Sequence, residues 1–346
     1  MGFKFERSGP MTTVQDLGRY GYQKDGFSVS GVMDRRSAIT ANFLVGNEAG
    51  DPVLEFLLIG PRIMMTSDAV IAVTGGDFTP KINGQPMPMY EAVAVKKGDR
   101  LDFNLAIEGL WGYIAVANKL DIPLVMGSYS TNMKCEVGGF KGRKLKNDDE
   151  IDFREGGRSG LEFVGHTIEK EYFGDMKKDI RVVLGPQDDA FTEEGIKTFF
   201  EGDYVVTNEC DRMGYRLDGP VIEHKGSADI ISDGIPYGTI QVPSSGKPIV
   251  MLTDRQTTGG YTKIGSVVAV DMPQFVQSKQ GCCIRFVPVT VGDAQYELRK
   301  YEASLKALIH EKATAEDIDG VTEIKRQESA QKGKKKWSIK TLLHLN

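Results

Sequence analysis

Short apolar runs that end in glycine-containing turns recur through most of this chain. Residues 53–59, for example, end at Gly60. The dipeptide Asn83-Gly84 is a typical turn of a two-residue β-hairpin. Glycine makes up 40 of the 346 residues, a larger share of the chain than the usual ~7%. Many short strands joined by tight turns predict a mainly β protein, built as a barrel or a sandwich.

A few segments follow the helical pattern instead. Residues 34–45 are predicted to form a short helix with Asp34 as its N-cap. Residues 192–200 are predicted to form another, with Thr192 as its N-cap. Residues 294–313 carry apolar side chains at near-helical spacing. We therefore expect a few short helices beside the strands and one helix near the C-terminus.

The length of the chain predicts about two domains, at roughly 150 residues each. A weak internal repeat supports this division, because RYGYQKDG (residues 19–26) and RMGYRLDG (residues 212–219) share five of eight residues. Residues 147–179 are charged and lack sustained periodicity, which is typical of a boundary. The predicted division is a first β domain at residues 1–155, a linker at 156–179, a second β domain at 180–292, and a helix with a charged tail at 293–346.

Charge and composition exclude several classes of function. The net charge of −5 gives no electrostatic reason to expect binding to nucleic acid or to an acidic membrane surface. No apolar stretch reaches the ~18 residues of a membrane span, and the first residues contain no signal-peptide segment. The four cysteines form no C-x-x-C pair, and the four histidines lack metal-ligand spacing. We therefore expect a reduced, cytoplasmic protein without a metal site.

The densest group of polar side chains follows an apolar, strand-like run at residues 248–253. The next eight residues read DRQTTGGY. A buried strand followed by varied polar groups and glycines is a common way to present a binding or catalytic site. A polar turn between two strands is the alternative. The candidate residues here are Asp254, Arg255, Gln256, Thr257, Thr258 and Tyr261.

Residues elsewhere in the chain offer the same chemistry. An arginine can grip a planar anion with two bonds, a carboxylate can orient it or act as a base, a glutamine can bind an amide or lactam, and a tyrosine can donate to an oxyanion. The residues of these four kinds are Arg19, Arg212, Arg216, Arg255, Asp16, Asp34, Asp254, Gln15, Gln187, Gln241, Gln256, Tyr22, Tyr215 and Tyr261. In the alternative, Arg–Asp pairs brace barrel corners and the tyrosines pack. The sequence has no P-loop, no G-x-G-x-x-G before a helix and no nucleophile elbow.

Several long phrases resemble one known family and follow its order over about residues 5–290. The main ones are TTVQDLGRYGY (12–22), SGVMD (30–34), DRMGYRLDGP (211–220), IQVPSSGKPIVMLTDRQTTGGY (240–261) and DMPQFVQ (271–277). They resemble the biotin-dependent carboxyltransferase-like family. Its members include the C subunit of bacterial 5-oxoprolinase, the second allophanate-hydrolase-type subunit, the carboxyltransferase region of urea amidolyase, and an antagonist of a sporulation-kinase inhibitor.

The resemblance implies two cyclophilin-like β-barrel domains. It implies partners homologous to the A and B subunits of 5-oxoprolinase, with which a C subunit converts 5-oxo-L-proline to L-glutamate at the expense of ATP, although the ATP site is not assignable to this chain. Two alternatives stay open. One is transfer of a carboxyl group to a urea-like amide, with biotin on a separate carrier. The other is a non-enzymatic antagonist that binds a kinase inhibitor of the B-subunit type.

We expect the candidate residues to line one groove that binds a small cyclic amide with one carboxylate. The expected catalytic residues are Asp16, Arg19, Asp34, Asp254 and Arg255. The expected substrate-binding residues are Tyr22, Arg212, Tyr215, Arg216, Gln241, Gln256, Thr257, Thr258 and Tyr261.

Overall fold

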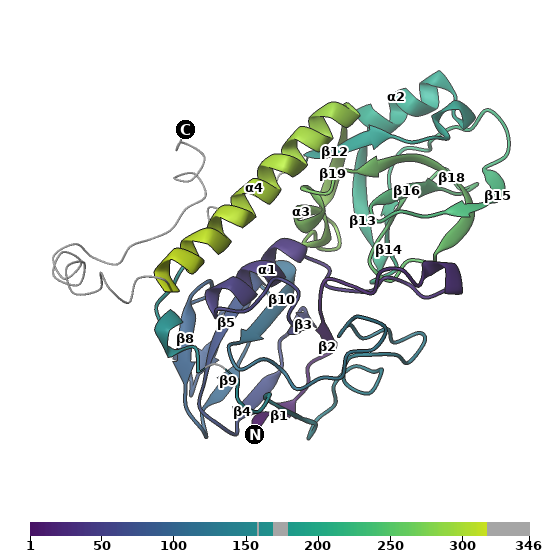
Figure 1. Cartoon of the computed structure of the whole chain (residues 1–346). Coiled ribbons are helices and arrows are strands. Elements are labelled where there is room, and N and C mark those ends of the chain that lie inside the picture. The colour runs from purple at the N-terminus through teal and green to yellow at the C-terminus, as the bar shows by residue number, and fades with distance from the viewer. Residues whose placement is uncertain (158, 169–178, 317–346) are drawn as a thin grey trace.

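The computed structural model describes residues 1–157, 159–168 and 179–316, with side chains up to residue 303. The described residues form many short β-strands in three sheets, and their helices are few (Figure 1). The predicted mainly β fold class is therefore confirmed. The lysine-rich tail and much of the predicted linker lie outside the described residues. No helix among the described residues is long and apolar enough to span a membrane.

The first structural unit, which contains strands β1 to β11, is built from two sheets that pack against each other. One has the strand order β11-β1-β4-β9-β6-β7 and the other β2-β3-β10-β5-β8. Apolar side chains from both sheets, such as Phe3, Phe56 and Ile114, form one buried cluster between them. The strands are β1 (Gly2–Arg7), β2 (Thr12–Gln15), β3 (Val53–Leu57), β4 (Arg62–Met65), β5 (Ala69–Asp77), β6 (Lys81–Ile82), β7 (Gln85–Pro86), β8 (Ala92–Val95), β9 (Arg100–Asp102), β10 (Glu108–Val116) and β11 (Glu150–Asp152).

The hairpin predicted from Asn83-Gly84 is confirmed as the turn between β6 and β7. Both turn residues have positive φ, 51° at Asn83 and 81° at Gly84. This conformation is typical of a type I′ turn, which asparagine and glycine tolerate better than other residues.

The second structural unit contains strands β12 to β19, which form a single sheet that closes on itself. Its order is β12-β19-β13-β14-β17-β16-β18-β15, and β12 also pairs with β18. This extra pairing closes a barrel and leaves β15 outside it, paired with the first residues of β18. The strands are β12 (Asp179–Leu184), β13 (Asp203–Cys210), β14 (Gly214–Asp218), β15 (Asp229–Gly234), β16 (Thr239–Val242), β17 (Ile249–Met251), β18 (Thr258–Val267) and β19 (Cys283–Pro288).

Both predicted helix caps are confirmed. The Asp34 carboxylate accepts the N–H of Ser37 at 3.0 Å, and the Thr192 hydroxyl accepts the N–H of Gly195 at 2.9 Å. Each bond satisfies a backbone donor in the first helical turn. The α-helices are α1 (Arg35–Leu44), α2 (Glu193–Glu201), α3 (Met272–Val276) and α4 (Val291–Glu316), and the 3-10 helices are η1 (Gln23–Asp25), η2 (Leu161–Phe163) and η4 (Asp188–Ala190). Helix α4 confirms the predicted C-terminal helix, whereas α3 was not predicted.

The two units share a continuous apolar core. Val32 and Trp111 of the first unit belong to the same buried cluster as Tyr215 and Phe275 of the second. Figure 1 shows α4 running beside both units. Its Glu297 forms an ion pair with Arg181 of β12 at 3.6 Å, and its Tyr301 ring lies 5.8 Å from the guanidinium of Arg36 on α1. These contacts connect α4 to both units.

Candidate functional site

The polar phrases identified in the sequence meet where the two units join. The hydroxyl of Ser28 donates to the carbonyl of Arg255 at 2.8 Å, and the N–H of Ser30 donates to the carbonyl of Thr253 at 3.0 Å. The segment at residues 28–30 therefore lies along the loop between β17 and β18. Segments more than 220 residues apart in sequence thus form a single surface at a domain junction, which is a frequent position for ligand sites.

This junction contains a pocket of about 300 Å³. Its wall combines residues of both units, namely Gln23, Ser28, Val29, Gly234, Ile235, Pro236, Arg255, Gln256 and Thr257. Arg255, Gln256 and Thr257 were predicted site residues, whereas Gln23 and Ser28 were not. The pocket thus brings a guanidinium, two amides and two hydroxyls around one small volume.

The guanidinium of Arg255 is fixed at one edge. Its Nε donates to the carbonyl of Ile235 at 2.7 Å, and its Nη1 donates to the carbonyl of Leu252 at 3.1 Å. The guanidinium also lies over the ring of Tyr237, 5.8 Å from its centroid. Burial lowers the pKa of Arg255, and the nearby tyrosines oppose that shift. Within the described residues, no hydrogen bond or ion pair engages Nη2, so one donor edge of a held arginine is available to an anion.

A buried ionic network lies beside Arg255. Arg212 donates to Asp254 from Nε at 2.7 Å, to Glu55 from Nη1, and to the carbonyl of Gly31 from Nη2 at 2.6 Å. Burial opposes the charge on Arg212, but Asp254 and Glu55 outweigh it and raise its pKa. Since all three nitrogens of Arg212 are engaged, its geometry is that of a positioning residue, which holds Asp254 next to Arg255.

A second cluster surrounds Asp16 and Arg19. The Asp16 carboxylate accepts the Gly18 N–H at 2.8 Å, the Ser128 hydroxyl at 2.7 Å and the Tyr129 N–H at 2.6 Å. Arg19 is fully buried, and its Nε and Nη2 donate to the carbonyls of Val125 and Ser130. Its Nη1 has no acceptor within the described residues. Burial lowers the pKa of Arg19, and Asp16 partly offsets this effect.

Asp34 and Tyr215 lie in the contact between the units. The Asp34 carboxylate caps α1 and accepts the side-chain amide of Gln277 at 2.9 Å. The Tyr215 hydroxyl accepts the indole N–H of Trp111 at 3.0 Å and donates to the carbonyl of Val276 at 2.9 Å. Both side chains are buried with their polar atoms bonded, so their geometry fixes the junction rather than presenting groups to the pocket.

The structure does not bring the remaining predicted residues into the pocket. Arg216 points to solvent, with its side chain 53% exposed, and forms an ion pair with Glu209 at 3.0 Å. Thr258 and Tyr261 are exposed on β18, and Tyr22 precedes η1. Gln241 is buried on β16, on the opposite face from the core residues Ile240 and Val242.

Glu55 and Gln277 are structurally important residues that the sequence reasoning did not select. Glu55 accepts from Arg212, from the Met33 N–H at 2.6 Å and from the Tyr113 hydroxyl at 2.9 Å. A signal for it existed, because Glu55 is the single charge in the apolar run at residues 53–59. A charged residue inside a buried strand requires partners.

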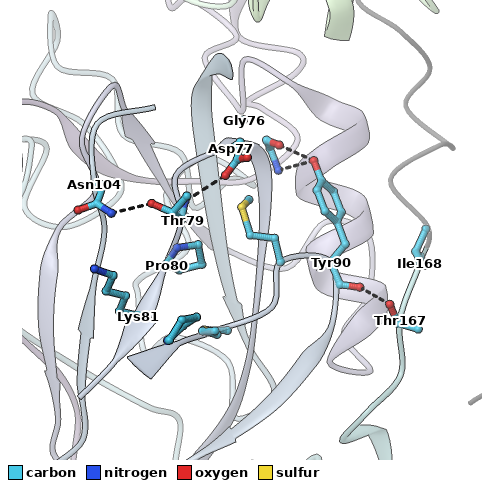
Figure 2. A pocket seen from close by; sticks show the side chains of 13 residues that line it. Gly76, Asp77, Thr79, Pro80, Lys81, Tyr90, Asn104, Thr167 and Ile168 are labelled. Carbon is cyan, nitrogen blue, oxygen red and sulfur yellow. Dashed lines mark hydrogen bonds between the residues drawn. The ribbon is translucent and has the colours of Figure 1, made fainter. Parts of the chain in front are cut away.

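A larger pocket of about 710 Å³ lies in the first unit and contains none of the predicted site residues (Figure 2). Its wall includes Pro80, Pro86, Met87 and Met89. The Tyr90 hydroxyl, which donates to the carbonyl of Gly75 and accepts its N–H, forms one side. We take the smaller junction pocket as the candidate site, because a fixed guanidinium and two amides converge there. Among the described residues no group of histidine, cysteine and carboxylate side chains could hold a metal ion.

Comparison with known proteins gives a family match for most of the chain. The family described as "Carboxyltransferase domain, subdomain A and B" matches residues 25–288. The C subunit of 5-oxoprolinase from Escherichia coli is 34% identical over 291 residues, covering 84% of this chain and 92% of that protein. The protein of the same name from Haemophilus influenzae is 31% identical over 297 residues, covering 85% and 93%. The urea amidolyase of Saccharomyces cerevisiae is 29% identical and covers 87% of this chain but only 17% of its own length.

Solved structures show the same architecture. The Kluyveromyces lactis urea amidolyase superposes with a TM-score of 0.81 at 28% identity, over 89% of this chain. The chain spans only 20% of that much longer protein. The protein TTHA0988 superposes with a TM-score of 0.74 at 31% identity, over 83% of this chain and 55% of its own.

Proposed function

The chain belongs to the carboxyltransferase domain family, and we propose that it is the C subunit of an ATP-dependent 5-oxoprolinase. Together with the A and B subunits it converts 5-oxo-L-proline to L-glutamate. The two relatives that are named as C subunits of 5-oxoprolinase support this choice, because this chain covers 92% and 93% of their lengths. In the urea amidolyases the matching region is a small part of a much longer chain.

The junction pocket is the observation that carries the proposal. 5-Oxoproline is a small cyclic amide with one carboxylate. The free edge of Arg255 suits the carboxylate, and the amides of Gln256 and Gln23 suit the lactam. Gln256 offers a donor and an acceptor, whereas Gln23 offers its NH2 group, because its Oε1 already accepts the Gly21 N–H at 2.9 Å. The loop that carries Arg255 and Gln256 is held by Ser28 and Ser30 of the other unit.

In this proposal the chain binds and orients the lactam. Arg255 holds the substrate carboxylate, and the side-chain amides fix the plane of the ring. Asp254, which Arg212 holds at 2.7 Å, precedes Arg255 in the loop and anchors the backbone from which Arg255 reaches the pocket. Positioning of this kind supplies a large part of the rate of a reaction between bound groups.

ATP supplies the activation that the opening of a stable lactam requires. The described residues around the junction pocket provide one free guanidinium edge and no glycine-rich loop with a lysine, so they do not fit a triphosphate. The nucleotide is therefore assigned to the whole complex of the three subunits and not to this pocket.

Reconstitution tests the proposal. The chain is mixed with the A and B subunits that are its partners, and the glutamate formed from 5-oxoproline is measured with and without ATP. We expect turnover that needs all three proteins and ATP. Absence of turnover in every mixture would reject the proposal.

The structural likeness to urea amidolyase, with a TM-score of 0.81, favours one second candidate, which is a carboxyltransferase acting on a urea-like amide. That reaction requires biotin on a separate carrier protein. Addition of avidin to the reconstituted mixture separates the two functions, because avidin inhibits carboxyl transfer and leaves the 5-oxoprolinase reaction unchanged.

A further inference from the structure

A lysine side chain is buried on the outer wall of the second barrel. Lys263 on β18 is 3% exposed, and its ammonium nitrogen lies 3.2 Å from a carboxylate oxygen of Asp233 on β15. The Asp233 side chain is itself 59% exposed. Within the described residues the ammonium has no hydrogen-bond acceptor in good geometry. An ammonium carries three N–H donors, so a buried lysine with this single partner has unused donor capacity.

A second buried donor faces Lys263 across the sheet. Gln241 on β16 is the direct ladder partner of Lys263, and side chains of directly opposed residues lie on the same face. Gln241 is 2% exposed, and its Nε2 has no acceptor within the described residues. A buried polar group without a partner costs free energy, and such groups are rare in native structures. Two adjacent buried donors with unused capacity indicate a position that binds a hydrogen-bond acceptor.

This position lies directly behind the wall of the junction pocket. A Cβ atom placed on Gly259 would be 3.0 Å from Nε2 of Gln241, 3.4 Å from Nε2 of Gln256 and 2.6 Å from Cδ1 of Ile235. Gln256 and Ile235 line the junction pocket. Both amides therefore lie close to Gly259, and a side chain at residue 259 would collide with this group.

We propose that Lys263 and Gln241 form a binding site for a small oxyanion of the carboxylate or phosphate type. Only an acceptor can use the donors of both side chains, and only an anion also balances the buried ammonium. Asp233, whose other carboxylate oxygen accepts the Gly234 N–H at 2.7 Å, pairs with the ammonium until the oxyanion displaces it. The assignment is independent of the proposed function, because it rests on the buried donors alone.

Titration calorimetry on the full chain tests this site, at constant ionic strength with chloride as the reference anion. The probes are inorganic phosphate, acetate and 5-oxo-L-proline. We expect saturable binding of at least one probe, weakened at least tenfold by Lys263→Met and by Gln241→Leu. Binding by phosphate alone assigns the site to a phosphoryl group, and binding by the two carboxylates alone assigns it to a substrate carboxylate.

Two further variants keep the test independent of misfolding. Asp233→Asn removes the competing carboxylate and is expected to tighten binding several-fold, which damage to the fold would not do. Lys197→Met, at an exposed lysine of α2, is the matched control and is expected to bind as the unmodified chain does. Lack of binding by all three probes, or equal binding by the unmodified chain and Lys263→Met, would overturn the proposal.

Discussion

Arg212, in the turn between β13 and β14, donates a hydrogen bond to the carboxylate of Glu55 on β3, and this buried ion pair joins the two units. Both residues are almost inaccessible to solvent, at 3% for Arg212 and 1% for Glu55. Arg212 also holds Asp254 at 2.7 Å. The same guanidinium therefore fixes the junction between the units and the loop that carries Arg255.

Arg212→Met is expected to destabilise the protein strongly. The substitution leaves Glu55 buried without its cation, and breaking a buried pair from one side costs about 3–5 kcal/mol. The free energy of unfolding from urea titrations measures the effect. Arg216→Met, at the exposed arginine of β14, is the matched control and is expected to change stability by no more than about 0.5 kcal/mol.

The double variant Arg212→Met with Glu55→Leu separates the pair from the packing around it. If the uncompensated carboxylate causes the loss, removing it recovers part of the stability. A double variant that loses the sum of both single effects would contradict the ion-pair explanation.

Tyr215→Phe is expected to affect stability and not substrate affinity. Loss of the hydroxyl leaves the indole N–H of Trp111 and the carbonyl of Val276 unpaired in the core. Each unsatisfied buried group costs about 1–3 kcal/mol. The free energy of unfolding and the KM for 5-oxoproline in the reconstituted complex are the two measurements. A raised KM with unchanged stability would instead support the substrate contact expected from the sequence.

Tyr215 and Arg216 show why part of the site could not be predicted from the sequence. The two neighbours lie on opposite faces of β14, so one is buried between the units and the other points to solvent. Local signals such as the caps at Asp34 and Thr192 and the turn at Asn83-Gly84 were predicted, because nearby residues determine them. The face that a strand residue occupies depends instead on strands far away in the sequence.

The same reason explains the residues that were missed. Gln23 and Ser28 reach the pocket only because their segment docks on a loop of the second unit. Nothing in their immediate neighbourhood in the sequence indicates that docking. The Asp254–Arg255 pair was predicted, since a dense polar phrase follows a buried strand, but the anchoring of Asp254 by Arg212 and Glu55 required the fold.

Arg255→Ala is expected to lower kcat/KM for 5-oxoproline by about 10- to 100-fold, which corresponds to about 1.4–2.8 kcal/mol. The loss follows from removal of the donor that binds the carboxylate. Arg255→Lys keeps the charge but is expected to restore little, because an ammonium cannot reproduce the bonds to Ile235 and Leu252 together with a ligand contact. Arg216→Ala serves as the control, and equal activity of Arg255→Ala and this control would remove Arg255 from the site.

His224 is expected to make the protein less stable as the pH falls below neutrality. Its ring lies 4.6 Å from that of Phe191, and its Nε2 is 2.9 Å from the Thr262 hydroxyl. Burial lowers the pKa of His224 in the folded state, whereas the unfolded chain retains a value of about 6.5. Below about pH 6.5 the unfolded state therefore binds the proton first, which favours unfolding until the pH reaches the folded pKa.

The free energy of unfolding at pH 7.5 and pH 5.5, measured for the unmodified chain and for His224→Gln, checks this prediction. The variant has no ring to titrate, so its stability is expected to fall less between the two pH values than that of the unmodified chain. His310→Gln, at a histidine of α4, controls for removal of a histidine as such. Equal pH dependence in the unmodified chain and His224→Gln would show that the ring titrates alike in the folded and unfolded states, contrary to the effect of its burial against Phe191.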